Sequence, residues 1–140
     1  MKTRRTLLKK LVLAVLILSI YPLFVLVYTW GHVLSSDLEG GRHGPLDGYR
    51  HALASAVVSY TLGDWAVELV TSLMEAKSKN SNKMDSHNNR VGIKIGLNAR
   101  SFTDLEPAVH ERALNGAENS NDPNQITWLP KKSWREAKLW

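Results

Sequence analysis

An uncharged and almost wholly apolar run, residues 11–30, most constrains how this chain can fold. A helix of about 20 residues, rising about 1.5 Å per residue, is about 30 Å long, which is the thickness of a bilayer core. Pro22 falls inside the run, and spanning helices tolerate proline better than soluble helices do. The run therefore predicts a transmembrane helix embedded in a lipid bilayer, with Tyr28 and Trp30 at the outer interface.

The basic residues are unevenly distributed around this run. Five of the 18 lysines and arginines precede it, and the 13 that remain equal the 13 acidic residues in number. This asymmetry predicts a single-pass protein of the inner (cytoplasmic) membrane whose C-terminal part is periplasmic or extracellular. Because that part is formally neutral, nucleic acid is not expected as a partner. A cleaved signal peptide is the alternative, but its apolar region is usually only about 7 to 15 residues long.

The rest of the chain suggests an all-α fold, with the transmembrane helix followed by a small domain of three to five short helices. We expect a basic N-terminus and anchor at 1–30, a linker at 31–45 and a helical extracytoplasmic domain at 46–140. Gly40-Gly41 and Gly44-Pro45 break regular structure, and a linker of this kind lets the domain move relative to the membrane.

Apolar side chains recur every three or four residues from 46 to 60, which predicts a helix that ends near Gly63. Asp64 has the position of an N-cap for a second helix. The apolar stripe of that helix consists of Val67, Val70, Leu73 and Met74. A polar stretch at 76–83 is expected to form a loop.

Residues 91–97 alternate apolar and polar side chains as a strand does, but they also continue a helical face from Met84. We favour a helix, because a lone strand lacks a partner. A further helix is predicted at 107–114, and Ser133-x-x-Glu136 has the form of a capping box that begins a last helical turn. The C-terminal part also holds Trp128, Trp134 and Trp140. We expect these side chains to dock the tail on the domain; the alternative is that they contact the membrane surface or a partner.

Two short polar motifs stand next to apolar residues. In the first, Asp47, Arg50 and His51 project from nearly one face of a helix. An Asp beside a His raises its basicity, which suits a general base or a metal ligand, and an Arg can hold an anionic group. The alternative is structural, with Asp47 capping the helix while Arg50 pairs with Glu68 or Glu75.

The second motif combines the side chains of Asp85, His87, Asn88 and Asn89, all of which can bind a divalent cation. Its structural alternative is an Asp N-cap followed by Asn side chains that bond to the backbone. The spacing matches no strong zinc signature. Glu75 lies between the motifs and could be a general base or a ligand, while His32 and His43 are expected to be solvated.

The chain resembles an uncharacterised bacterial helical domain family marked by Arg-His-Ala and Asp-x-x-Asn-Asn. The resemblance rests on Asp47-x-x-Arg50-His51-Ala52, then Glu75, then Met84-Asp85-x-His87-Asn88-Asn89-x-x-Gly92. Members of the family are small exported or membrane proteins and C-terminal parts of polymorphic-toxin-type proteins. The resemblance covers residues 46–97 and suggests hydrolytic activity. It implies that six residues converge: Arg50, His51, Glu75, Asp85, Asn88 and Asn89. The family usually has histidine where this chain has Met74.

The leading hypothesis is a hydrolase-like site that acts on envelope material, with a divalent metal as its candidate cofactor. In it His51 is the general base, and Asp85 and Glu75 orient it or bind a cation. Arg50 holds an anionic group, and the substrate is positioned by Asp47, His87, Asn88 and Asn89. The alternative is a non-enzymatic membrane protein in which these side chains form a structural or partner-binding network.

Overall fold

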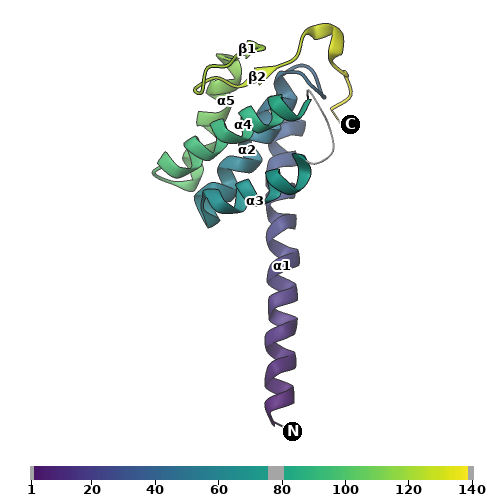
Figure 1. Ribbon diagram of the computed structural model, residues 1–140, viewed down its shortest axis with the longest axis vertical. Coiled ribbons are helices and arrows are strands. Elements are labelled where there is room, and N and C mark those ends of the chain that lie inside the picture. Colours follow the sequence, from purple (N-terminus) through teal and green to yellow (C-terminus); the bar gives the residue numbers. More distant parts are fainter. Residues whose placement is uncertain (1, 76–80, 139–140) are drawn as a thin grey trace.

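The structure is a computed structural model that describes residues 2–75 and 81–138. Its α-helices in this part of the chain are α1 (Lys2–Ser35), α2 (Pro45–Leu62), α3 (Asp64–Glu75), α4 (Ser81–Asn98) and α5 (Leu105–Leu114). Short 3-10 helices lie at η1 (Phe102–Asp104) and η2 (Lys131–Ser133), and β1 (Ala117–Glu118) pairs in parallel with β2 (Thr127–Trp128). The prediction of an all-α fold with one long apolar N-terminal helix is confirmed (Figure 1).

Helix α1 is long and apolar enough over Arg4–Ser35 to cross a membrane. It continues five residues past Trp30, so the first part of the expected 31–45 linker is helical. Val33 is buried in the core of the domain, and Val25 and Tyr28 pack against that core from the same helix. The C-terminal third of α1 is therefore packed against the domain, and residues 36–44 of the expected linker separate α1 from α2.

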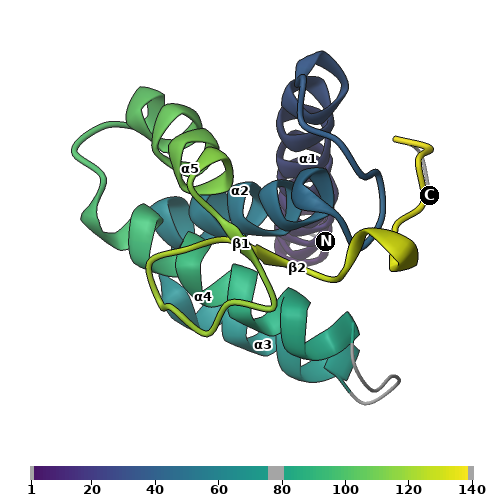
Figure 2. The same cartoon turned by 90° about the horizontal axis from the view of Figure 1, so that it is seen from above.

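Helix α2 lies at the centre of the domain, between α1 on one side and α4 on the other (Figure 2). Gly92 of α4 lies against the backbone of Ala52, and Gly96 lies against that of Ala56, so the two helices run side by side in the same direction. A methyl group at either glycine would overlap a carbonyl oxygen of α2. This close approach brings the two polar motifs together.

The structure settles the segment that could have been strand or helix. Residues 91–97 are helical, as favoured, and α4 already begins at Ser81, so residues 81–83 do not belong to a loop. Helix α3 begins at Asp64, whose Oδ1 accepts the backbone N–H of Trp65. Of the predicted α3 stripe, Val67 is buried, and the other three side chains lie outside the described part.

The C-terminal tail differs from the prediction. Ser133 ends η2, and Trp134 has an extended backbone (φ −76°, ψ 152°), so the predicted capping box with Glu136 does not form. The reason is a competing backbone pairing, since Arg135 bridges Arg42 in antiparallel fashion. Docking of the tryptophans is confirmed for two of them, because Trp128 packs on the core and the ring of Trp134 lies against Gly40. Trp140 lies outside the described residues.

Candidate functional site

The first turn of α2 presents a buried carboxylate. Pro45 occupies the first helical position, where its missing N–H costs nothing, and Asp47 follows at the third with its side chain 3% exposed. Asp47 Oδ2 accepts the backbone N–H of His43 at 2.7 Å, and Oδ1 accepts from Arg50. Asp47 thus bonds to the backbone just before the helix, but the N-cap is Gly44 with no side-chain cap bond, so the structural alternative in which Asp47 caps α2 is wrong. Arg50, however, pairs with Asp47 itself.

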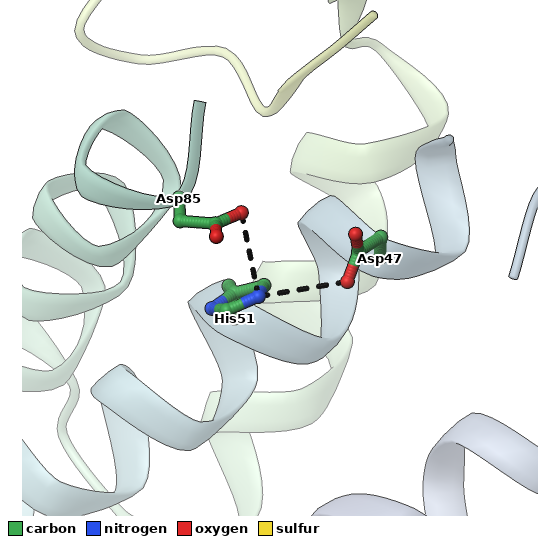
Figure 3. Close-up of side chains that lie close together, drawn as sticks. All are labelled: Asp47, His51 and Asp85. Atoms are coloured by element: carbon green, nitrogen blue, oxygen red, sulfur yellow. Dashed lines mark ion pairs between the residues drawn. The ribbon is translucent and has the colours of Figure 1, made fainter. Parts of the chain in front are cut away.

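His51 lies one turn further along α2, beside Asp85 of α4 (Figure 3). Its Nε2 is 3.5 Å from Asp47 Oδ1 and 3.4 Å from Asp85 Oδ1. Both distances exceed the usual 2.7–3.2 Å or so of a well-formed hydrogen bond. The side chains of His51 and Asp85 are 27% and 29% exposed, so solvent reaches the group. His51 Nε2 therefore faces one oxygen of each carboxylate, and neither distance is short enough for a well-formed hydrogen bond.

Asp85 carries a carboxylate whose charge is only partly compensated by its neighbours. Its Oδ1 is buried and has no hydrogen-bond partner among the residues that the structure describes. Burial raises the pKa of this carboxyl, His51 lowers it, and the neighbouring Asp47 charge raises it again. Burying a charged group costs free energy unless it is paired or coordinates a metal. Asp85 therefore points to a cationic partner that would compensate its charge.

Asp47, His51 and Asp85 each offer a ligand atom, and the three atoms lie within 4.8 Å of one another. Zinc binds His nitrogen and carboxylate oxygen at about 2.0–2.2 Å in tetrahedral geometry, which places neighbouring ligand atoms about 3.4 Å apart. The distances around His51 Nε2 agree with that spacing. Nitrogen and oxygen donors of this kind suit a borderline divalent cation. The sequence spacing gave no zinc signature, because the set is assembled from two helices.

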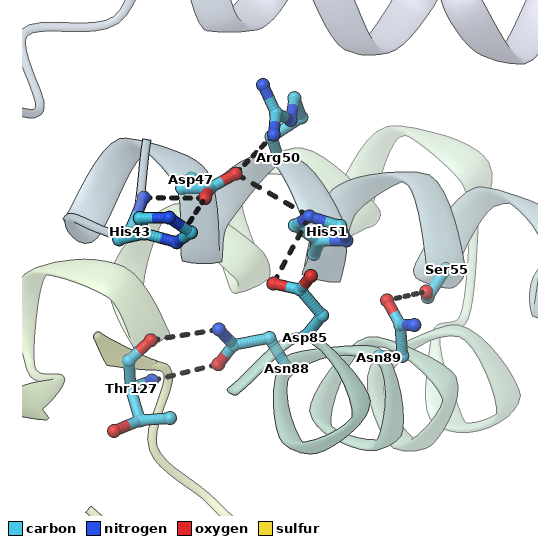
Figure 4. Close-up of polar contacts among 9 residues, drawn as sticks. All are labelled: His43, Asp47, Arg50, His51, Ser55, Asp85, Asn88, Asn89 and Thr127. Carbon is cyan, nitrogen blue, oxygen red and sulfur yellow. Dashed lines mark hydrogen bonds and ion pairs between the residues drawn. The ribbon is translucent and has the colours of Figure 1, made fainter. Parts of the chain in front are cut away.

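Two residues of the second motif hold the fold together (Figure 4). Asn88 is fully buried, and its amide exchanges two hydrogen bonds of 2.8 Å with the backbone N–H and C=O of Thr127 in β2. Asn89 Oδ1 accepts the Ser55 hydroxyl at 2.9 Å, which links α4 to α2. Both asparagines were expected to position substrate, whereas the contacts shown by the structure are with other parts of the chain.

His87 and Glu75 were also predicted as site residues. His87 Nε2 lies 2.8 Å from the Gln125 carbonyl, so the ring fastens the loop before β2 to α4 instead of joining His51. Glu75 ends α3, and its side chain lies outside the described part of the structure. The structure thus brings together Asp47, Arg50, His51 and Asp85 from the eight predicted residues.

Sequence reasoning missed two contacts of the site. His43 was expected to be solvated, but its Nδ1 is buried 4.0 Å from Asp47 Oδ2 and has no hydrogen-bond partner in the described part of the chain. Its backbone is left-handed (φ 63°), a conformation that no spacing rule reveals for a histidine. The Arg50 guanidinium lies over the Trp30 ring at 5.3 Å, which connects the site to α1.

Comparisons with family models, with curated proteins and with solved structures give no match for this chain. The resemblance to the helical family with Arg-His-Ala and Asp-x-x-Asn-Asn motifs stays a prediction. The site geometry is therefore the main support for a functional conclusion.

Proposed function

We propose that this chain is a single-pass membrane protein whose helical domain binds a divalent transition-metal ion through Asp47, His51 and Asp85. The observation that carries the proposal is the position of His51 Nε2, 3.5 Å from one carboxylate oxygen and 3.4 Å from another. An imidazole that merely donates a hydrogen bond has one proton on that nitrogen and satisfies one close acceptor. A cation between the three atoms would satisfy all of them.

The proposed chemistry is metal-assisted hydrolysis. Three protein ligands leave a coordination position for water, and a metal lowers the pKa of that water towards neutrality. In this proposal His51 is a ligand rather than the general base. Arg50 balances the charge of Asp47 and holds its carboxylate in place. The exposure of His51 and Asp85 leaves a route for substrate.

Envelope material is the proposed substrate class, and its argument is location. Helix α1 is long and apolar enough to hold the domain against a membrane, and the basic N-terminus favours an orientation with the domain outside the cytoplasm. Expression of the full chain in a bacterial membrane tests this step. We expect the wild type to slow growth or release envelope fragments, and His51→Ala and Asp85→Ala to be inert at equal expression. Equal effects from all three would contradict hydrolysis.

Calorimetric titration of the detergent-solubilised chain with Zn²⁺ and with Mn²⁺ tests the metal site. We expect one saturable ion per chain, and an affinity at least about 100-fold lower in His51→Ala and Asp85→Asn. Asn98→Ala is the matched control, because its side chain is exposed and its amide donates to the Lys94 carbonyl within α4, away from the three candidate ligands. Absence of saturable binding to the wild type would contradict the proposal.

A structural network is the second candidate, and one observation favours it. Asp47 is nearly fully buried, and both of its oxygens already accept hydrogen bonds, from His43 N–H and from Arg50. If the group only holds helices together, His51→Ala lowers stability and the wild type binds no metal. The same titration, read beside unfolding of the two proteins, separates the candidates.

A further inference from the structure

One face of α1 is covered by the domain well inside the apolar run. Tyr21, Val25 and Tyr28 follow one another at helical spacing, and they contact the end of α2, the core and η1. Their opposite face remains apolar and exposed, and it includes Leu23, Leu26, Val27 and Leu34. The upper part of the membrane helix therefore has the domain on one side and an unpaired apolar surface on the other.

The hydroxyl contact between Tyr21 and Thr61 fixes the level of the domain along α1. Tyr21 lies nine residues before Trp30, which is about 14 Å along a helix. If the bilayer core extends to Trp30, the end of α2 lies below its surface. The bilayer core could instead begin at Thr6, with Lys9 and Lys10 reaching back to the headgroups. A span of 20 residues then ends at Val25, and Tyr21 still lies about 6 Å below the surface of the core.

The surface of the domain at that level is apolar. We define the α2–α3 elbow as residues 61–69, in which Leu62, Trp65 and Leu69 are 45%, 59% and 52% exposed. The indole N–H of Trp65 donates to the Leu62 carbonyl at 2.7 Å, so the ring has no unsatisfied donor that would oppose its entry into lipid.

The acidic residues of the elbow limit its depth. Asp64 and Glu68 are exposed and lie four residues apart, next to the stripe formed by Trp65 and Leu69. Helices with this division of faces lie in the membrane interface, with the apolar face about 5–10 Å into the headgroup and acyl boundary. That depth falls within the range given by the level of Tyr21.

We infer that the α2–α3 elbow is a second membrane contact, seated in the interface of the bilayer that α1 crosses. The occupant of this apolar surface is lipid, because the surface is continuous with the apolar α1 and is held at the level of Tyr21. The inference rests on α1 spanning the membrane and is independent of the metal site. It places the domain partly within the outer leaflet rather than above it.

Spin labels on single cysteines test this contact in lipid vesicles, and the chain has no native cysteine to remove. Leu62→Cys and Leu69→Cys replace half-exposed side chains, and Leu114→Cys is the matched control. Leu114 is 62% exposed at the end of α5 that lies away from the elbow (Figure 1). We expect labels at the elbow to collide with oxygen and to be protected from a water-soluble nickel complex. Protection no greater than at Leu114 would overturn the inference.

Quenching of tryptophan fluorescence by lipids brominated near the headgroup gives a second readout. Trp65→Phe keeps an apolar ring at the elbow, and Trp134→Phe is the control because Trp134 lies against Gly40 at the C-terminal tail. We expect Trp65→Phe to lower the quenched fraction, whereas Trp134→Phe removes an unquenched emitter and should not lower it. An equal quenched fraction in wild type and Trp65→Phe would overturn the inference.

Discussion

The two polar motifs look alike in the sequence but have different tasks in the structure. At 47–51, Arg50 and His51 lie next to the Asp47 carboxylate, and His51 also faces Asp85 Oδ1, which has no hydrogen-bond partner among the described residues. At 85–89, only Asp85 joins that group, while Asn88 and Asn89 make short hydrogen bonds to β2 and α2. Buried amides with matched partners specify packing, whereas a histidine that faces two carboxylates without a short hydrogen bond to either indicates a ligand site.

Removing the amide of Asn88 gives the largest effect that the comparison predicts. Asn88→Ala leaves the buried N–H and C=O of Thr127 without partners, and each such group costs about 1–3 kcal/mol. We expect the free energy of unfolding in micelles to fall by about 4 kcal/mol. Asn98→Ala, on the exposed side of α4, should change it by less than about 0.5 kcal/mol. A loss below about 1 kcal/mol would remove Asn88 from the packing role.

A methyl group between α2 and α4 should have the next largest effect. Gly92→Ala places that methyl against the Ala52 carbonyl, so the helices must separate. Overpacking of this kind costs about 1–3 kcal/mol, and we expect a value near the upper end. Gly31→Ala is the matched control, because a methyl there meets nothing within 4 Å, and helix propensity favours alanine. Similar unfolding curves for the two variants would contradict the close approach.

The pH dependence of stability separates Asp85 from its neighbours in the second motif. Because burial raises its pKa above the ordinary 3.8, Asp85 contributes stability that is complete below that pH and is lost as pH rises through the raised pKa. Without metal, Asp85→Asn should therefore unfold at higher denaturant than the wild type at pH 7, with the difference vanishing near pH 4. Saturating metal should reverse the order at pH 7, because metal binds the ionised carboxylate. If the metal-free wild type is more stable than metal-free Asp85→Asn at pH 7, the raised pKa of Asp85 is contradicted.

The smallest effect concerns the link from Asn89 to α2. Ser55→Ala removes one hydrogen bond of 2.9 Å, which contributes about 1 kcal/mol to stability. We expect that loss in chemical unfolding, with metal affinity unchanged within about twofold. A large fall in affinity would show that Asn89 and Ser55 belong to the site after all.

Local patterns were enough to predict much of the fold. Uncharged length predicted α1, apolar periodicity predicted α2, and the competing strand pattern at 91–97 was resolved correctly because a lone strand lacks a partner. The capping box at Ser133 was wrong, since its rule describes only local bonds and the tail instead pairs with Arg42, far away in the sequence.

The candidate site was predictable only in part. The joint occurrence of His51 and Asp85 suggested a shared site, and they do meet. The partner of Asn88 lies 39 residues away in a two-residue strand, so it has no periodic signal. The burial of His43 depends on a left-handed backbone that sequence spacing does not encode.

Nitrogen NMR of the histidine side chains reports each ring nitrogen separately, so it shows whether a metal ion binds His51. The chain has five histidines, and the account predicts that Zn²⁺ shifts Nε2 of His51 strongly while Nε2 of His87 stays unchanged at the Gln125 carbonyl. In Asp85→Asn the His51 shift should require far more metal. A shift at His87 with none at His51, or no shift at any histidine, would contradict a metal site at the meeting point of the two motifs.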